Sequence, residues 1–442
     1  MQTLAQLQSG QLQGATRVKM ACELTEFPQE LYSLANTLEI LDLSGNNLSS
    51  LPEDFHRFHQ LKILFLSDNK FTVFPEVLGK CKQLEMIGFK ANQLEFISEE
   101  ALPVNTRWLI LTNNKLQEVP KSIGKCARMQ KLMLAGNQLK TLPSELKECK
   151  NLGLLRISAN KLTELPDWLL TMPKLCWIAF SGNPFSIKKD IKETQLASID
   201  WNELTLLEPL GEGASGIIWK AVWKQETGNE TVAVKLFKGA ITSDGLPEDE
   251  MNACMLAGNH PNLVNLIGKL INNPEGKKGL ILSLIPPHYT ILGNTPSFES
   301  CTRDVYKEDT FFSLNDTITI AKGISSVASQ LHERGILHGD LYPHNTLIGN
   351  NAHPLFGDFG AASFYNTNHA HAPFLERIEV NAFGCLLEDL ITYTKADNSD
   401  LRIIESLIEL KENCMQAAVL ERPSFVTICK RLNEISVAFI NN

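Results

Sequence analysis

Long apolar runs are missing from the 442-residue sequence, and their absence limits where the protein can reside. No stretch of about 18 consecutive apolar residues occurs, so we expect no membrane-spanning helix. The N-terminus has no basic region followed by an apolar core, so we expect no secretion signal. The net charge of -9 argues against nucleic acid as the main partner. Together these absences favour a cytoplasmic protein that binds neither membrane nor nucleic acid.

Cysteine pairs with the spacing of a metal or redox site are also missing. The ten cysteines are scattered, and no two of them form a C-x-x-C motif. Cys81, Cys126 and Cys149 occupy one equivalent place in a repeat. This pattern is typical of small buried apolar side chains in a reducing compartment, and it disfavours a disulfide framework or a zinc site.

A repeat with a period of 23 residues fills the first half of the chain. Its frame is visible in Leu61-x-x-Leu64-x-Leu66-x-x-Asn69-x-Phe71-x-x-Phe74-Pro75. The frame resembles the leucine-rich repeat, and a weaker copy around Val18 and Phe27 resembles an N-terminal cap. The resemblance implies an α/β solenoid of horseshoe form over residues 1–187. The asparagine of the frame recurs at Asn46, Asn69, Asn92, Asn114, Asn137, Asn160 and Asn183.

The frame has a direct physical interpretation. Leu64 and Leu66 alternate on a short strand and should both point inward, where each gains about 1.5–3 kcal/mol from burial. One repeat cannot enclose its own leucines, so neighbouring repeats must stack. We expect each asparagine amide to be buried and to bond to the backbone of an adjacent coil. The first turn of a helix tolerates proline, so we expect the convex segments to begin at prolines. These are Pro52, Pro75, Pro120, Pro143 and Pro166.

A second set of strand positions should face outward along the concave side of the array. Six and four residues before each asparagine, these positions are largely apolar. An exposed apolar stripe of this length predicts a docking site, either for another protein or for the second half of the chain. Alternatively, the first position of each pair merely packs at the strand edge. The stripe comprises Ile40, Ile63, Phe65, Met86, Trp108, Ile110, Met133, Leu154 and Trp177, with Asp42, Lys131 and Arg156 as charged exceptions.

The second half carries a group of polar motifs in a fixed order. His338-Gly-Asp340 is followed by Asn345 five residues after the aspartate, and then by Asp358-Phe-Gly360. These motifs resemble the catalytic loop and the D-F-G motif of protein kinases. The resemblance implies that Asp340 accepts the proton of the attacking hydroxyl, and that Asn345 and Asp358 bind magnesium. The interval between Asn345 and Asp358 is long enough for a short hairpin.

The upstream motifs complete the resemblance to a protein kinase. Gly211-Glu-Gly213-Ala-Ser-Gly216 leads into a predicted strand, where a dinucleotide-binding loop would enter a helix. A second predicted strand ends at Lys235, which the resemblance assigns to the α and β phosphates of ATP. Glu250 is the expected acidic partner of Lys235, with Glu248 and Asp249 as alternatives. The resemblance also assigns Ile218, Ala233, Ser283 and Leu284 to the nucleotide, with Leu282 near the adenine.

The resemblance extends over residues 204–442 and ends with Arg422-Pro-Ser-Phe425. It implies an α+β bilobal domain that uses ATP and Mg and acts on a protein substrate, with Ser/Thr specificity as a family expectation. Residues 188–203 are left as a linker or cap, with a short helix expected over Lys188 to Ile199.

Three departures from the kinase pattern affect activity. Gly339 replaces the family's arginine, so switching by a phosphate on the activation segment is doubtful, although Ser363, Tyr365 and Thr367 are candidates for modification. Tyr342 replaces a lysine that reaches the γ-phosphate, so one cation is missing unless His344 or a partner supplies it. The family's A-P-E is reduced to Ala372-Pro-Phe, which shortens the peptide platform.

Three functions fit this sequence. The first is an ATP-dependent protein kinase whose repeats recruit the substrate or regulate the enzyme. The second is a nucleotide-binding pseudokinase scaffold, which the presence of Lys235, Asp340 and Asp358 disfavours. The third is a small-molecule phosphotransferase of related fold, because H-G-D-x-x-x-x-N also occurs in such enzymes.

Overall fold

Two compact units make up the chain in a computed structural model. The first comprises Met1–Leu175 with Asn183–Phe185, and the second comprises Cys176–Gly182 with Ser186–Asn442. The structure describes residues 1–187, 196–213, 215–226, 228–238, 241–242, 244–395, 397 and 400–440. Residues 176–182 belong to the last repeat by sequence, yet they count with the second unit.

The helix expected over 188–199 is not found where the structure describes that segment. Residues 188–195 lie outside the described residues, and Ala197–Asp200 form a strand, β9. Strand β9 pairs in parallel with residues 268–271 of strand β13 (Leu266–Ile271). This pairing supplies the hydrogen bonds that favour an extended backbone over residues 197–200. The domain limits 1–187, 188–203 and 204–442 otherwise stay a prediction.

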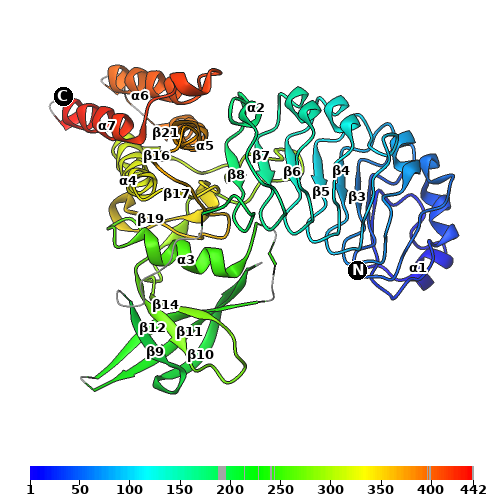
Figure 1. Cartoon of the computed structure of the whole chain (residues 1–442), viewed down its shortest axis with the longest axis horizontal. Helices are drawn as coiled ribbons and strands as arrows, with labels where there is room; N and C mark the ends of the chain where they lie inside the picture. The colour runs from blue at the N-terminus through cyan, green and yellow to red at the C-terminus, as the bar shows by residue number, and fades with distance from the viewer. Residues whose placement is uncertain are drawn as a thin grey trace. The chain divides into compact units, whose positions relative to one another are not determined.

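The first unit is a stack of coils, each with one short strand (Figure 1). Successive strands pair in parallel and in chain order. Leu64 and Leu66 are fully buried, as the alternation of the frame predicted. The strands are β1 (Arg17–Lys19), β2 (Ile40–Asp42), β3 (Ile63–Phe65), β4 (Met86–Gly88), β5 (Trp108–Ile110), β6 (Lys131–Met133) and β7 (Leu154–Arg156).

The asparagines form a ladder of buried hydrogen bonds, as predicted. The amide of Asn137 donates to the carbonyls of Leu134 in its own coil and Leu111 in the preceding coil, both at 2.9 Å. Its oxygen accepts the backbone N–H of Leu116 at 3.1 Å. Asn69 repeats the pattern between its own coil and the preceding one. Each asparagine therefore joins two coils through backbone groups that would otherwise be buried without partners.

Short helical segments follow most strands, and prolines precede them. Pro75, Pro120 and Pro143 are N-caps with φ between -63° and -66°, close to the value that the ring imposes. The helical segments are α1 (Leu4–Gln8), η1 (Gln29–Leu34), η2 (Phe55–Arg57), η3 (Glu76–Lys80), η4 (Lys121–Lys125), η5 (Ser144–Glu148) and α2 (Asp167–Leu170).

All ten cysteines of the chain are free thiols, and burial raises the pKa of Cys126 to about 11.

The expected apolar stripe is less exposed than predicted. Ile63, Met86 and Leu154 are buried, so the alternative in which the first position packs at the strand edge is correct for these three residues. The remaining apolar positions of the first unit are half-buried, namely Ile40, Phe65, Trp108, Ile110 and Met133. Trp177 is buried within the second unit.

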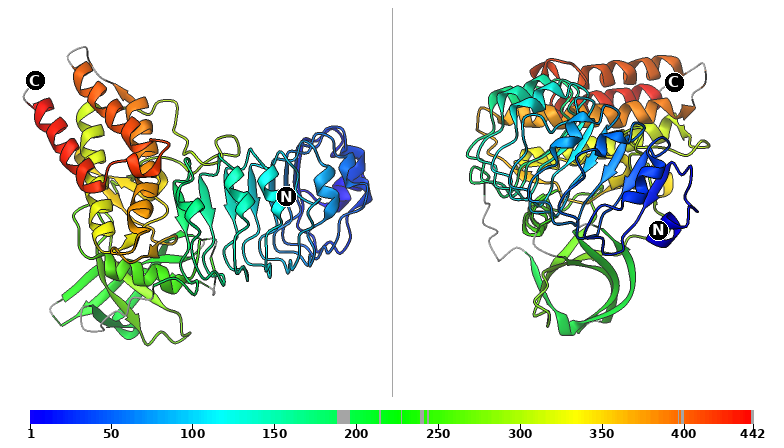
Figure 2. Two further views of the ribbon diagram at one scale, coloured as in Figure 1. Left: turned by 45° about the horizontal axis from the view of Figure 1, so that its top comes forward. Right: turned by 90° about the vertical axis from the view of Figure 1, so that its right-hand side faces the viewer.

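The second unit contains a strongly curved, mostly antiparallel sheet (Figure 2, right). Its strand order is β10-β11-β12-β14-β13-β9, with β13 and β9 parallel. A core that includes Ile199, Val234 and Ile281 fills the inside of the sheet. The strands are β10 (Leu204–Glu212), β11 (Gly216–Gln225), β12 (Gly228–Phe237), β13 (Leu266–Ile271) and β14 (Gly279–Ser283), and helix α3 (Pro247–Ala257) lies between β12 and β13 in sequence.

Helices dominate the remainder of the second unit. Helix α4 packs against α7, and α5 packs against α6. Short strands connect them, and the hairpin predicted between Asn345 and Asp358 is formed by β18 and β19. Among the described residues, no helix has both the length and the apolar character needed to cross a bilayer. The elements are β8 (Trp177–Ala179), β15 (Thr290–Ile291), β16 (Phe312–Ser313), α4 (Leu314–Glu333), β17 (Ile336–Leu337), β18 (Thr346–Ile348), β19 (Pro354–Phe356), β20 (Ser363–Phe364), α5 (Ala372–Thr392), β21 (Thr394–Lys395), α6 (Leu401–Cys414) and α7 (Phe425–Ile440).

Candidate active site

A buried ion pair joins the small sheet to helix α3. Lys235 lies near the end of β12, and its ammonium pairs with the carboxylate of Glu250. Both side chains are largely buried. Pro247 occupies the first turn of α3, and the carboxylate of Glu250 reaches inward from that same turn. Of the alternative partners, Glu248 pairs instead with Lys278, at 3.1 Å on the surface. The structure therefore selects Glu250, as the sequence predicted.

Asp358 lies beside this ion pair. Its backbone has a φ of 59°, and its Oδ1 accepts the N–H of Gly360 at 3.2 Å. Burial alone would lower the pKa of Lys235, but the carboxylates of Glu250 and Asp358 outweigh burial and raise that pKa above its ordinary value. Lys235 therefore carries its charge at neutral pH, with two carboxylates near it.

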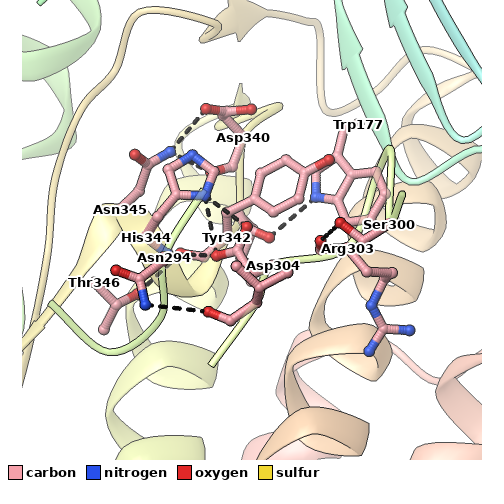
Figure 3. Close-up of polar contacts among 12 residues, drawn as sticks. Trp177, Asn294, Ser300, Arg303, Asp304, Asp340, Tyr342, His344, Asn345 and Thr346 are labelled. Carbon is pink, nitrogen blue, oxygen red and sulfur yellow. Dashed lines mark hydrogen bonds and ion pairs between the residues drawn. The ribbon is translucent and has the colours of Figure 1, made fainter. Parts of the chain in front are cut away.

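Asp340 and Asn345 come together on the loop between β17 and β18 (Figure 3). The amide of Asn345 donates to the Asp340 carboxylate at 2.7 Å and to the Asp340 carbonyl at 3.0 Å. The hairpin formed by β18 and β19 then leads the chain back to Asp358. The predicted base Asp340 and the predicted metal ligand Asn345 thus share one loop, and the second predicted metal ligand, Asp358, follows the hairpin.

His338 connects this loop to the segment that holds Asp358. Its Nδ1 lies 3.3 Å from the backbone N–H of Asp340, and its Nε2 lies 3.1 Å from the carbonyl oxygen of Gly357. Burial lowers the pKa of His338, although three nearby carboxylates oppose this shift. A neutral ring with its proton on Nε2 satisfies both contacts.

Glu379 anchors the same loop from helix α5. Its carboxylate accepts the backbone N–H of Gly339 at 2.6 Å and that of His338 at 3.2 Å. It also lies 2.8 Å from the ring of His332. Burial would raise the pKa of Glu379, but the contact with His332 and, to a smaller extent, the backbone N–H of Gly339 outweigh burial and lower this pKa. The sequence analysis assigned no role to Glu379, so this anchoring contact was missed.

The three loop glycines differ in their surroundings. A Cβ on Gly211 or Gly213 would meet no atom within 4 Å, so this part of the backbone is open. A Cβ on Gly216 would lie 2.4 Å from the carbonyl oxygen of Leu236, because Gly216 pairs with β12. Glycine at 216 is thus required by strand packing, whereas 211 and 213 leave room for a ligand to approach the backbone.

The residues assigned to the adenine side lie on adjacent strands. Ile218 pairs with Lys235 across β11 and β12, and Ala233 pairs with Leu282 across β12 and β14. Ser283 ends β14, and both Ser283 and Leu284 are half-buried. A cavity of about 540 Å³ borders these last two residues, and its other lining residues include His260, Asn265 and His353.

The two replaced loop positions have specific environments. Tyr342 is buried, and its ring lies 4.9 Å from that of His344. His344 is held by Asp304, whose carboxylate lies 2.8 Å from its Nδ1. Of the modification candidates, Ser363 and Tyr365 are buried, and only Thr367 is exposed. The expectation that all three are open to modification is therefore wrong for Ser363 and Tyr365, because both pack inside the second unit.

Comparison with known families agrees with this geometry. The family model for the protein kinase domain matches residues 204–382, and the model for leucine rich repeats matches residues 36–94. The chain therefore contains leucine-rich repeats and a protein kinase domain. The kinase-domain match includes the glycines, Lys235, Glu250, Asp340 and Asp358.

Curated relatives include both classes of protein kinase. A probable serine/threonine-protein kinase, gdt4 of Dictyostelium discoideum, is 33% identical over 157 residues, which is 35% of this chain and 8% of the relative. The serine/threonine-protein kinase mos of Gallus gallus is 27% identical over 180 residues, 37% of this chain and 49% of the relative. The tyrosine-protein kinase ABL2 of Mus musculus is 28% identical over 270 residues, 50% of this chain and 21% of the relative. The chain thus spans half or less of the length of these relatives.

Proposed function

We propose that the protein transfers the terminal phosphoryl group of magnesium-bound ATP to Ser or Thr hydroxyls of a protein substrate. The observation that carries this proposal is the buried pair of Lys235 and Glu250 with Asp358 beside it. A buried ammonium that is oriented by one carboxylate and neighboured by another is the arrangement that nucleotide phosphates and their metal require.

The residues present fit the nucleotide and the metal. Lys235 would contact the phosphates, and the open backbone at Gly211 and Gly213 would cover them. Asp358 and Asn345 offer the carboxylate and amide oxygens that magnesium prefers. When bound, the metal would neutralise the charge that develops on the phosphates during transfer.

Asp340 is the proposed general base. Its carboxylate is half-buried, and the amide of Asn345 fixes its orientation at 2.7 Å. A carboxylate held in this way can accept the proton of a substrate hydroxyl as the new P–O bond forms, a role worth roughly 10²–10⁴-fold in rate. Tyr342 provides no cation, so we expect a lower turnover than in kinases that have a lysine at this position.

The repeats are proposed to recruit a protein or to regulate the kinase domain. The half-buried residues Phe65, Trp108, Ile110 and Met133 on one side of the predicted horseshoe support an apolar contact surface. The proposed Ser/Thr specificity rests on similarity to the probable serine/threonine-protein kinase gdt4 and the serine/threonine-protein kinase mos, whereas ABL2 is a tyrosine-protein kinase. The free thiols of all ten cysteines support a cytoplasmic, reducing location.

A phosphate-transfer assay tests the proposal. The full chain is incubated with magnesium and γ-labelled ATP, alone and with a generic protein substrate, and phosphoamino acids are identified. We expect label on Ser or Thr, and a loss of at least about 100-fold in Asp340→Asn. The exposed residue Asp309 provides the matched control, Asp309→Asn, which should retain wild-type activity.

Three results would contradict the proposal. Equal transfer by wild type and Asp340→Asn would remove Asp340 as the base. Label on tyrosine alone would overturn the Ser/Thr assignment. Label on small hydroxyl compounds but never on protein would favour the small-molecule phosphotransferase.

A further inference from the structure

Residues of the last repeat pack directly on the catalytic loop. Strand β8 belongs to the same compact unit as the kinase domain. The ring of Trp177 stacks on that of Tyr342, with centroids 4.2 Å apart and planes 10° from parallel. The indole N–H of Trp177 donates to the carbonyl of Leu341 at 3.0 Å (Figure 3). Trp177 is only 3% exposed, so the contact is fully desolvated. Two residues next to Asp340 in the chain are thus held by one side chain.

The backbone of β8 approaches the loop closely at a second point. Gly339 has a φ of 73°, and a Cβ on it would lie 2.5 Å from the carbonyl oxygen of Ile178. No side chain fits there without displacing β8. The glycine and the tyrosine that depart from the kinase pattern are therefore both in the contact with β8.

The segment after Asp358 makes a third contact with the last repeat. The backbone N–H of Phe180 donates to the hydroxyl of Ser363 at 2.9 Å. Ser363 lies in β20, which pairs with β17 immediately before His338. Residues 177–180 therefore hold both the loop that carries Asp340 and the segment that follows Asp358.

We propose that Trp177 is a positioning residue for phosphoryl transfer, through which strand β8 fixes the loop that carries Asp340. This inference rests on the proposed kinase function. Trp177 touches no reacting atom and acts through Leu341 and Tyr342. Positioning matters because a displacement of about 1 Å in a reacting group costs on the order of 100-fold in rate.

Three variants of the full chain test the proposal. Trp177→Ala removes both the stack and the hydrogen bond, whereas Trp177→Phe keeps an aromatic ring on Tyr342. Trp168, which is half-buried on α2 in the first unit, provides the control Trp168→Ala. We expect kcat to fall about 10- to 100-fold in Trp177→Ala with the KM for ATP changed less than about twofold. Trp177→Phe should recover most of the loss, and Trp168→Ala should match wild type.

Hydrogen exchange supplies a readout that does not depend on activity. In Trp177→Ala the amides of residues 338–346 and 361–364 should exchange at least about tenfold faster, while those of β11 and β12 stay unchanged. If the wild type transfers no phosphate, the proposed function fails, and this measurement alone decides the positioning role. Unchanged exchange in the loop would overturn the proposal. The proposal would also be overturned if the kcat of Trp177→Ala equalled or exceeded that of wild type. A higher kcat would assign β8 an inhibitory role instead.

Discussion

Replacing Gly339 by alanine adds one methyl group where the catalytic loop lies close to two backbone carbonyl groups. The new Cβ would lie 2.5 Å from the carbonyl oxygen of Ile178 and 2.8 Å from that of Ala361, where ordinary contacts begin near 3.4 Å. Relieving this overlap should cost about 1–3 kcal/mol. The φ of 73° adds about 1–2 kcal/mol for any residue with a Cβ. We therefore expect Gly339→Ala to destabilise the second unit by about 2–5 kcal/mol.

A second glycine separates the two contributions to that cost. Gly276 has a φ of 67°, but a Cβ on it would meet no atom within 4 Å. Gly276→Ala should therefore show only the backbone cost of about 1–2 kcal/mol. The free energy of unfolding is measured by urea titration, with hydrogen exchange to restrict the result to the second unit. If Gly339→Ala cost no more than Gly276→Ala, the close approach of β8 to the loop would be refuted.

Two further predictions concern the repeats and the dependence on pH. Asn137→Ala should destabilise the first unit by about 3 kcal/mol, because it removes three hydrogen bonds to buried backbone groups. The control Asn151→Ala loses two solvent-exposed hydrogen bonds and should cost less than about 1 kcal/mol in the same urea titration. The lowered pKa of His338 means that the unfolded chain binds its proton more readily, so stability should fall as pH drops below about 6.5. His338→Asn should flatten this decline in stability, whereas His288→Gln, which changes an exposed histidine, should leave it unchanged. If the pH dependence of stability in His338→Asn equalled that of wild type, the assignment of the decline to His338 would be contradicted.

The sequence predicted the features that repeat or that follow a fixed spacing. Leu64 and Leu66 were assigned to the core from their alternation, and Asn69 to the coil junction from its period. Glu250 was chosen as the partner of Lys235 from its distance along the chain, and the ion pair is present. These predictions succeeded because one strand or one helical turn fixes each of these side chains.

The sequence could not predict contacts between distant segments. Trp177 was assigned to an exposed stripe because its repeat position matches that of Trp108, and nothing local to it indicates Tyr342. Glu379 follows His338 by 41 residues, and its bonds to backbone N–H groups leave no pattern in the sequence. The sequence made Ser363 a candidate for modification, but its hydroxyl is buried and accepts the backbone N–H of the distant Phe180.

The assignment of β8 to the second compact unit has a consequence for engineering the repeat array. We expect that whole 23-residue modules can be inserted or deleted among the coils that contain β2 to β7 without changing the structure of the catalytic loop. The reason is that the stability of each coil depends mainly on the coils next to it. The module that ends at Asn183 is different, because its strand β8 belongs to the second compact unit. Chimeras with a new array should therefore join the foreign coils before Cys176 and keep residues 176–182 native.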